Sequence, residues 1–527
     1  MLTRFKSKYL FLILLCLPCF TAISQSLDVE LGPELKLSKG FFFQDHLYSD
    51  DSGHYIYLYH KVPVFGYYET TMILEKYSPS FEKIYSQEYK TDAKGVETHG
   101  VKYVKGNFAF LLSEKNRKED YMKYMVRPID FEGKAGKQVT VAKFQYDGKK
   151  DIPETYWELS NDTTQLAFAA ISDQGKKEKA EIFLSVVDLN FEKVWDGKFN
   201  FPFVENQFTF NSMVLGNDGS VYILAKVYED ENAKESKKGG SKGRVAAYNM
   251  SIFHFTKDAK SPKVYQLELG GEYISGAGIK LSNNKEIICS GIYSNAKNGP
   301  VVGTFLTKLS AIDGKVLVSN KKAMGKEEIE MLSDRNVDKK KGDTGLDTDF
   351  TFQDVVLKDN GSISITAEEQ YKKTKFNTAS TRNPMYTVYY NLDILSMNID
   401  KNGELERVAV IPKKQISTDP LYCSFVTLQN EDEVYFFYND DKDNLRRPLT
   451  AKPKKITNYK DCVAVVTIQD KNGKLSRKKL FGQKDTDALF VPGYSKQISK
   501  NELFFVAQRY RLFAKTDFQL GIVRIKE

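Results

Sequence analysis

The sequence predicts an all-β fold, and within that class a β-propeller of eight four-stranded blades. A hairpin pattern recurs along the chain, for example "LGNDGSVYILAKV" from Leu215 and "LKDNGSISITAEE" from Leu357. Each copy is followed by a loop of variable length and by a second hairpin, so each unit holds four strands. The last unit provides only three strands, and a strand-like segment precedes the first unit. Antiparallel four-stranded units in radial repetition build a β-propeller.

The number of blades is predicted from the number of second strands, one in each unit. Eight such strands are expected, near Tyr55, Phe108, Leu166, Val221, Glu286, Ile363, Val434 and Leu503. Their spacing fits four short strands plus one loop. Units of this kind without long helices favour a propeller over a pair of β-sandwiches or a stacked array. Seven blades would result if one early unit were degenerate.

Tight turns mark the second hairpin of each unit. Asn402–Gly403 lies between two alternating segments of the sixth unit, and Asn472–Gly473 holds the same place in the seventh. The first unit turns through Ser78–Pro79–Ser80 instead. Asn-Gly pairs suit hairpin turns because both residues tolerate a positive φ.

The two ends of the chain are predicted to share one blade. The eighth unit offers "GYSKQIS", "NELFFVAQRY" and "FQLGIVRIKE" as three strands, and "SLDVELGPELKLS" covers Ser26 to Ser38 near the N-terminus. We expect the N-terminal strand to complete the eighth blade. This closes the ring and removes two exposed sheet edges.

Residues 1–24 have the features of a secretory signal peptide. Three basic residues precede a short apolar run, and Ala22 and Ser24 lie three and one positions before a predicted cleavage site ahead of Gln25. The run is shorter than the about 20 residues of a membrane span, which leaves a retained anchor as the weaker alternative. We therefore expect an exported protein, periplasmic or extracellular.

Residues 25–527 are predicted to form a single propeller domain, because a repeat architecture can exceed the size of a single core. Loop insertions are expected near 231–247, 323–350, 371–388 and 440–460. Beyond the signal segment, the cysteines are Cys289, Cys423 and Cys462. This count is too sparse for a disulfide framework. Cys289 lies in the apolar run "EIICSGI" and is predicted to be a small buried hydrophobe.

The fifth unit carries a resemblance. It reads "GAGIKLSNNKEIICSGIYSN" and then "TFLTKLSAIDGKVLVSN". This resembles the loosely defined repeats of bacterial secreted β-propellers, and the resemblance extends over nearly all of the chain after residue 24. The Ser-x-Asp-x-Gly-x-Thr-Trp box of sialidases and the Gly-His and Trp-Asp pairs of eukaryotic-type propellers are absent. The resemblance therefore implies an architecture and no activity.

Positive charge is concentrated in three loops. The stretches Lys234–Arg244, Tyr371–Met385 and Leu445–Lys455 contain 14 basic residues and one acidic residue, whereas the whole chain has a formal net charge of +8. Loops between second and third strands emerge on one face of a propeller, so we predict a basic rim that attracts an anionic partner. The alternative is that these loops only face solvent. The candidate binding residues are Lys237, Lys238, Lys242, Arg244, Lys372, Lys373, Lys375, Arg382, Arg446 and Arg447, with Tyr67 and Tyr68 as candidate stacking residues.

The leading hypothesis is a monomeric, non-catalytic binding protein. Its predicted partner is an anionic polysaccharide or a protein of the cell envelope, with no nucleic acid, no cofactor and no membrane-spanning segment after signal cleavage. A rigid scaffold within a larger envelope assembly is a related possibility.

The competing hypothesis is a glycan-acting hydrolase or lyase. The sequence has no Gly-x-Ser-x-Gly elbow, no His-Glu-x-x-His pair and no phosphate-binding loop. Such an enzyme would need carboxylates at the central funnel. Glu368 and Glu369 in "TAEEQY", with Glu229 and Asp230 in "VYEDE", are the candidates.

A metal site is not predicted. Asp343, Asp347 and Asp349 lie close together and would suit Ca²⁺ chemically, but their spacing departs from the EF-hand order. The histidines are expected to lie at the surface or to pack between blades: His46, His54, His60, His99 and His254.

Overall fold

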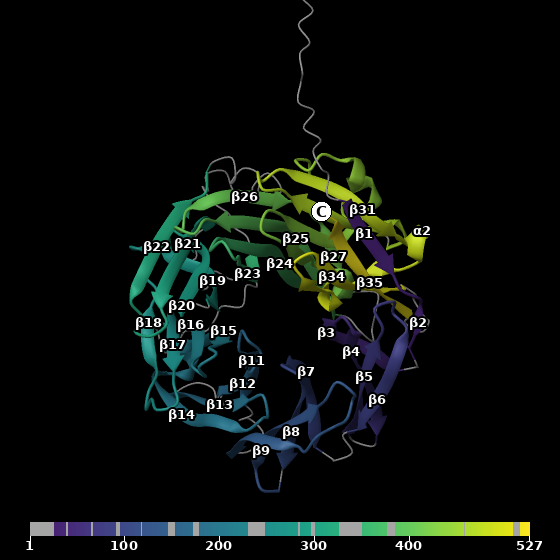
Figure 1. Ribbon diagram of the computed structural model, residues 1–527. Coiled ribbons are helices and arrows are strands. Elements are labelled where there is room, and N and C mark those ends of the chain that lie inside the picture. The colour runs from purple at the N-terminus through teal and green to yellow at the C-terminus, as the bar shows by residue number, and fades with distance from the viewer. Residues whose placement is uncertain are drawn as a thin grey trace, which may run out of the picture.

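The chain forms eight antiparallel sheets arranged in a ring around one axis (Figure 1). The computed structural model describes residues 26–37, 40–64, 67–90, 95–116, 118–145, 153–171, 179–229, 248–282, 285–296, 301–325, 350–376, 385–457, 459–509 and 517–526. The prediction of eight blades is confirmed, and the fold is an eight-bladed β-propeller.

Blades 1 to 4 each consist of four strands in sequence order. Blade 1 comprises β3 (Phe41–Asp50), β4 (Gly53–Val64), β5 (Tyr67–Tyr77) and β6 (Lys83–Lys90). Blade 2 comprises β7 (Val96–Val104), β8 (Asn107–Asn116), β9 (Tyr121–Ile129) and β10 (Val139–Gln145). Blade 3 comprises β11 (Glu154–Leu159), β12 (Gln165–Ile171), β13 (Lys179–Asp188) and β14 (Lys193–Val204), and the 3-10 turn η1 (Glu205–Gln207) leads to blade 4. Blade 4 comprises β15 (Phe208–Leu215), β16 (Val221–Tyr228), β17 (Tyr248–Phe255) and β18 (Lys263–Gln266).

Blades 5 to 7 follow the same order. Blade 5 comprises β19 (Tyr273–Leu281), β20 (Glu286–Ser294), β21 (Val301–Ser310) and β22 (Val316–Ala323). Blade 6 comprises β23 (Phe350–Leu357), β24 (Ile363–Phe376), β25 (Met385–Ile399) and β26 (Leu405–Ile411), and the short β27 (Gln415–Ser417) also pairs with β25. Blade 7 comprises β28 (Val426–Gln429), β29 (Val434–Asp441), β30 (Cys462–Gln469) and β31 (Leu475–Gly482). The 3-10 turns η2 (Pro420–Tyr422), η3 (Lys442–Arg446) and η4 (Tyr459–Asp461) lie in the connections around blade 7.

Blade 8 joins the two ends of the chain. The helical turn α2 (Gln483–Thr486) leads to β32 (Leu489–Phe490), η5 (Pro492–Tyr494), β33 (Lys496–Ser499), β34 (Glu502–Gln508) and β35 (Asp517–Lys526). β1 (Ser26–Leu31) pairs with β35 in antiparallel register, and β2 (Leu35–Lys36) extends the same ladder. In Figure 1 the purple β1 lies beside the yellow β35. The predicted closure of the last blade by the N-terminal strand is confirmed.

Glycines in the left-handed region close the predicted turns. Gly403 has a φ of 91° and Gly473 a φ of 80°. Their amides donate to Asp400 and Asp470, the residues that open each turn. Gly361 forms the corresponding turn between β23 and β24. A side chain at these positions would be strained, which explains why the Asn-Gly pattern recurs.

The first strand of each blade faces the axis (Figure 1), and contacts join neighbouring first strands such as β15 with β19 and β19 with β23. The register shifts once in β7, β15, β19 and β23, and twice in β3. Such bulges increase the local twist, which suits strands that line a ring.

The apolar core is divided into layers between neighbouring blades, each of which we call a seam. Among the described residues, the largest lies between blades 3 and 4, where 17 buried apolar residues include Trp195, Phe199 and Phe201. The smallest, counted in the same way, lies between blades 6 and 7 and holds eight. Each sheet thus buries its two faces against its neighbours, which is how a repeat protein builds a core from small sheets.

Several predicted segments fall outside the described residues. These are the signal peptide, most of the insertions at 231–247 and 323–350, and the aspartates Asp343, Asp347 and Asp349. The insertion expected at 371–388 is in part an extension of β24 and β25, and the one at 440–460 is described except for residue 458. Within the described ranges, no helix combines the length and apolar character needed to span a membrane.

Candidate functional site

The strand-2-to-strand-3 connections and the links between blades emerge on one face of the ring. Over blades 6 and 7, three parts of this face are described: the hairpin β24–β25, the link from residue 412 to 425, and the loop from 442 to 461. We call this region the blade 6/7 face. β24 and β25 are the longest strands described, and their ladder continues outward to the pair Phe376 and Met385.

Three exposed lysines occupy the outer part of β24. They are Lys372, Lys373 and Lys375. The ammonium of Lys373 lies 5.2 Å from the ring centre of Tyr371 and 5.5 Å from that of Tyr390, and these two rings stack with centres 4.5 Å apart. Cation–π contact holds the lysine against the hairpin while its charge stays accessible.

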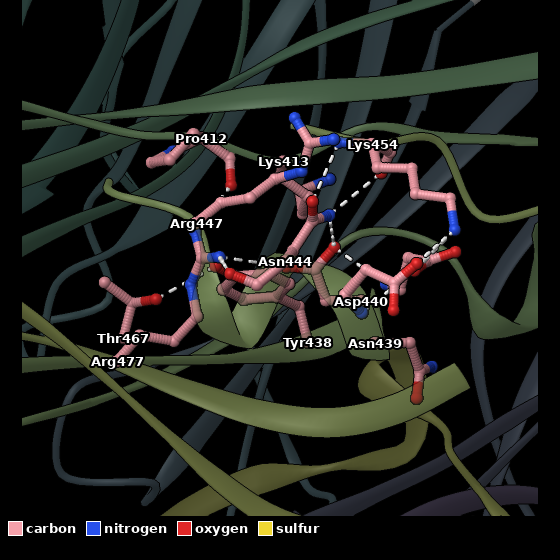
Figure 2. Close-up of polar contacts among 12 residues, drawn as sticks. Pro412, Lys413, Tyr438, Asn439, Asp440, Asn444, Arg447, Lys454, Thr467 and Arg477 are labelled. Carbon is pink, nitrogen blue, oxygen red and sulfur yellow. Dashed lines mark hydrogen bonds and ion pairs between the residues drawn. The ribbon is translucent and has the colours of Figure 1, made fainter. Parts of the chain in front are cut away.

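The blade 7 loop is held in shape by one buried asparagine. The side chain of Asn444 donates to the carbonyl of Lys454 at 2.9 Å, and its oxygen accepts from the Lys454 amide at 2.8 Å. Figure 2 shows Asn444 between Lys454 and Asp440, whose Oδ1 accepts from Asn444 at 2.6 Å. These bonds join two parts of the loop that are ten residues apart. The loop therefore has a defined conformation that internal hydrogen bonds hold, and it does not only face solvent.

A buried ion pair supports this loop from below. Asp440 and Arg477 are both buried, and Arg477 Nη1 lies 3.4 Å from Asp440 Oδ2. Arg477 also donates to the carbonyls of Asn444 and Pro412 (Figure 2). Burial raises the pKa of Asp440 to about 6, although the positive charge of Arg477 and the bond from Asn444 oppose this rise.

A second buried network lies in the same seam. Lys413 and Glu368 form an ion pair of 2.5 Å in which both side chains are fully buried. Glu368 also accepts from Ser424 Oγ at 2.7 Å and from Asn391 Nδ2 at 3.1 Å. Lys413 donates further to Gln415 Oε1 at 3.0 Å. Removing two charges from water costs several kcal/mol per ion unless hydrogen bonds of this kind compensate.

This network corrects a sequence hypothesis. Glu368 and Glu369 were candidates for catalytic carboxylates at the central funnel, but both are buried within blade 6. Glu368 is paired with Lys413, and the burial of this pair keeps a substrate from reaching its carboxylate. Glu229 is exposed at the end of β16, and Asp230 lies outside the described residues. The sequence shows carboxylates at strand ends but not the lysine that reaches one of them from 45 positions away.

A cavity of about 360 Å³ opens on the blade 6/7 face. Lys375 and Tyr386 of the β24–β25 hairpin form one side, Ser417 and Thr418 the second, and Lys455, Ile456, Thr457 and Tyr459 the third. Its lining therefore comes from three chain segments that the sequence places far apart.

The predicted binding residues divide into three groups. Lys372, Lys373, Lys375, Arg446 and Arg447 are described and exposed. The backbones of Tyr67 and Tyr68 lie at the start of β5. Outside the described residues lie Lys237, Lys238, Lys242, Arg244 and Arg382.

A second group of charged residues lies along the inner strands. Burial raises the pKa of Glu158, opposed by the charges of Lys102 and Lys280. Partial desolvation among the inner strands also raises the pKa of Asp45, although this residue stays exposed, and the charges of Lys496 and Lys102 oppose the rise. Glu158 and Lys280 line a cavity of about 550 Å³ in the central channel. The signal that would have found these residues is a charged side chain at a matching position in the first strand of several units.

Three histidines, His46, His54 and His254, and the described cysteines are buried and contribute to the packing of the sheets. His46 and His54 are buried in the seam between blades 8 and 1, and Ser49 Oγ lies 2.7 Å from a ring nitrogen of each. Cys289 is fully buried, as predicted, and Cys423 and Cys462 are buried free thiols. No group of three or more His, Cys, Asp or Glu suited to a metal ion occurs among the described residues.

Comparison with known proteins finds only distant structural similarity, at low sequence identity. No protein-family model matches the chain, and no curated protein matches it. The β-propeller domain of the trilobed protease from Pyrococcus furiosus is 12% identical, with a TM-score of 0.35 over 85% of this chain and 98% of that chain. A polysaccharide lyase is 11% identical, with a TM-score of 0.40 over 94% of this chain and 100% of that chain. A protein of unknown function from Dyadobacter fermentans is 11% identical, with a TM-score of 0.28 over 72% of this chain and 97% of that chain. The assignment to the β-propeller class rests on the eight sheets of this chain.

Proposed function

We propose that this protein is a non-catalytic, exported binding protein whose blade 6/7 face binds an anionic partner of the cell envelope or the cell exterior. The observation that carries the proposal is the set of exposed basic side chains on two braced supports: Lys372, Lys373, Lys375, Arg446, Arg447, Lys452 and Lys455. A basic surface of this kind steers anions from a distance and pairs with them on contact.

The charge of this face is only partly neutralised by its own acids. In the blade 7 loop, Asp443 accepts from Lys454 at 2.5 Å, and Asp461 pairs with Lys442. These pairs account for both acidic residues between 442 and 461. Arg446, Arg447, Lys452 and Lys455 therefore leave the loop with a net positive charge.

The internal hydrogen bonds of the blade 7 loop favour a binding role over a loop that only faces solvent. A loop that only faced solvent would need no internal partners, yet Asn444 and Asp440 hold this loop from within. Groups fixed before binding lose less conformational entropy when the partner arrives. Export is part of the proposal and is supported by the signal features of residues 1–24.

Retention on immobilised polygalacturonate and on neutral dextran, at low and high salt, tests the proposal. We expect retention on the acidic polymer at low salt and loss of retention at high salt, because salt screens exposed charges. The test variant combines Lys372→Gln, Lys373→Gln, Arg446→Gln and Arg447→Gln. The matched control changes four exposed lysines in turns of the opposite face: Lys105, Lys285, Lys401 and Lys471.

The proposal predicts that the test variant loses retention and the control keeps it. Equal retention of the two variants would show that the basic side chains of the blade 6/7 face do not form the binding surface.

A glycan-acting enzyme is a second candidate function, with the central channel as its candidate site. Glu158 and Asp45 on the inner strands, each with a raised pKa, are the observation that favours it, since a general acid for glycan cleavage is a carboxyl group whose pKa is raised. Release of reducing ends or of unsaturated products from acidic polysaccharides would support this function. Glu158→Gln should then abolish the release without changing retention on the polymer.

A further inference from the structure

The cavity on the blade 6/7 face lies at the junction of three segments. Lys375 and Tyr386 extend from the outer end of the blade 6 hairpin, Ser417 ends β27, and Lys455 and Tyr459 belong to the blade 7 loop. Its volume of about 360 Å³ is at the lower end of the roughly 300–1,000 Å³ of small-molecule sites. It would therefore accept a small group or a short part of a longer chain.

The charged residues in the described lining of this cavity are all basic. Lys375 and Lys455 line the cavity from different blades, and none of its described lining residues is acidic. An anion placed between them would gain attraction from both sides without a competing carboxylate.

Hydroxyl and aromatic groups supply the rest of the lining. The hydroxyl-bearing residues are Tyr386, Ser417, Thr418, Tyr422, Thr457 and Tyr459. Val388, Ile416 and Ile456 add apolar surface. A lining that mixes hydroxyls, aromatic rings and cations matches a sugar that carries hydroxyls, an apolar ring face and one carboxylate.

The wall behind this lining is fixed by hydrogen bonds. Gln415 is buried, its Oε1 accepts from the Ser424 amide at 2.7 Å, and its Nε2 donates to the carbonyl of Asn439 at 2.9 Å. The hydroxyls of Ser417 and Tyr459 lie 2.7 Å apart, which joins two sides of the cavity. The ring of Tyr459 also packs edge-on against Tyr422, with centres 5.5 Å apart. The site is thus largely formed before any ligand binds.

We infer that this cavity binds a uronate unit, a sugar ring bearing a carboxylate, of an acidic polysaccharide. The carboxylate lies between Lys375 and Lys455, and the ring hydroxyls face the Ser, Thr and Tyr hydroxyls of the lining. An acidic peptide would supply the charge but not the ring hydroxyls, so the hydroxyl-rich lining favours the saccharide. This inference rests on the proposed function, since it names the part of the partner that the basic face recognises.

Calorimetric titration of the full chain with digalacturonate tests the inference, with the neutral galactose disaccharide and a triglutamate peptide as comparisons. We expect digalacturonate to bind and the other two to bind at least about tenfold more weakly, a difference of about 1.4 kcal/mol. Lys375→Gln combined with Lys455→Gln should weaken digalacturonate binding by at least about tenfold, since hydrogen bonds to charged groups are the stronger class.

A matched control comes from the same two blades on the opposite face. Lys401→Gln combined with Lys471→Gln removes two exposed charges from turns that do not line the cavity, and it should leave digalacturonate binding within about threefold of wild type, well below the tenfold step of 1.4 kcal/mol. All four lysines are exposed, so unchanged thermal unfolding is expected for both variants.

The outcomes separate this inference from the proposed function. If the acidic polymer is retained but digalacturonate does not bind, or if both double variants lose equal affinity, the uronate inference is overturned and the basic face stands. If triglutamate binds as tightly as digalacturonate, the cavity recognises charge alone and the saccharide inference is likewise overturned. If wild type is not retained on polygalacturonate at low salt, both the proposed function and the uronate inference are overturned.

Discussion

The seam between blades 3 and 4 and the seam between blades 6 and 7 join their sheets in different ways. The first is filled by 17 buried apolar residues, and rings such as Phe201 and Phe253 meet with centres 5.0 Å apart. The second has eight buried apolar residues in the described part of the chain and encloses two ion pairs, Glu368 with Lys413 and Asp440 with Arg477. Apolar area stabilises a seam without regard to direction, whereas hydrogen-bonded charges fix the position of each partner.

The difference coincides with what each seam supports. The seam between blades 6 and 7, which we call the polar seam, lies under the blade 7 loop and the cavity wall. Its side chains form hydrogen bonds with both. Arg477 bonds to Asn444 of the loop, and Lys413 bonds to Gln415 of the wall. Buried ion pairs add little stability compared with apolar residues of the same volume. We infer that this seam is built for the geometry of the face above it.

The largest expected effect is in the polar seam. Lys413→Met leaves Glu368 buried without its counter-charge, and should lower the free energy of unfolding by about 3–5 kcal/mol. Adding Glu368→Gln removes the unpaired charge while keeping an acceptor for Ser424, so the double variant should recover at least half of the loss. Urea unfolding measures both. A double variant no more stable than Lys413→Met would mean that the pair is not the cause.

A loss of similar size is expected in the apolar seam, with a different consequence. Phe201 is almost fully buried, and Phe201→Ala should cost about 3–5 kcal/mol through lost contacts and a cavity. Because Phe201 lies far from blades 6 and 7 in the ring, retention on polygalacturonate should stay at the wild-type level below the unfolding transition. Reduced retention by the folded variant would contradict the separation between the two seams.

The pH dependence of stability should distinguish the polar seam. The pKa of Asp440 is about 6 in the folded protein and near 3.8 in the unfolded chain, so the folded state binds the proton more tightly. The stability that this proton contributes is therefore fully present below pH 3.8 and is lost as the pH rises through 6. Relative to Asp440→Asn, wild type should therefore gain stability between pH 7 and pH 4, by up to about 3 kcal/mol.

Asp443→Asn is the matched control for this titration. Asp443 belongs to the same loop, but its pKa is lowered by the bond from Lys454, so wild type should gain nothing over this variant as the pH falls. Parallel pH curves for wild type and Asp440→Asn would show that Asp440 titrates as it does in the unfolded chain.

A smaller effect on stability is expected for Asn444→Ala. It removes the bonds to Asp440 and to both backbone groups of Lys454, at a cost of about 1–3 kcal/mol. Limited proteolysis should cut the loop between 442 and 461 faster than in wild type, and retention on polygalacturonate should weaken. Unchanged cleavage of this loop would argue against the bracing role of Asn444.

The smallest effect is expected at the surface. Lys500 lies 2.6 Å from Asp359 across the face opposite the loops, but both side chains are more than two-thirds exposed. Water and salt screen such a pair, so Lys500→Gln should not measurably change the unfolding transition. A clear loss of stability would show that exposed pairs matter to this ring more than the seams suggest.

The fold was predictable from the sequence because each unit carries its own local signals. The Asn-Gly turns and alternating strands of a blade lie within one stretch of sequence, and the shortage of one strand in the last unit required the N-terminal segment. Local pattern was enough because, apart from the pairing of β1 and β2 with β35 that closes blade 8, each sheet is built from strands of one continuous stretch of the chain.

The site was predictable only in part. The basic loops could be read from composition, which placed Arg446 and Arg447 on an exposed loop. The bonds that shape the site join residues that local pattern does not connect, such as Glu368 with Lys413 and Ser417 with Tyr459. Glu368 was misassigned for this reason, since nothing in "TAEEQY" shows that a lysine of the next link is its partner.

The most direct test of the central claim is the affinity for polygalacturonate as a function of salt, for wild type and for Arg446→Gln with Arg447→Gln. The proposed function predicts that wild-type affinity falls steeply as salt rises, and that the variant binds more weakly with a shallower dependence, because two of the charges that hold the polymer are gone. Equal affinity and equal salt dependence in the two proteins would contradict it.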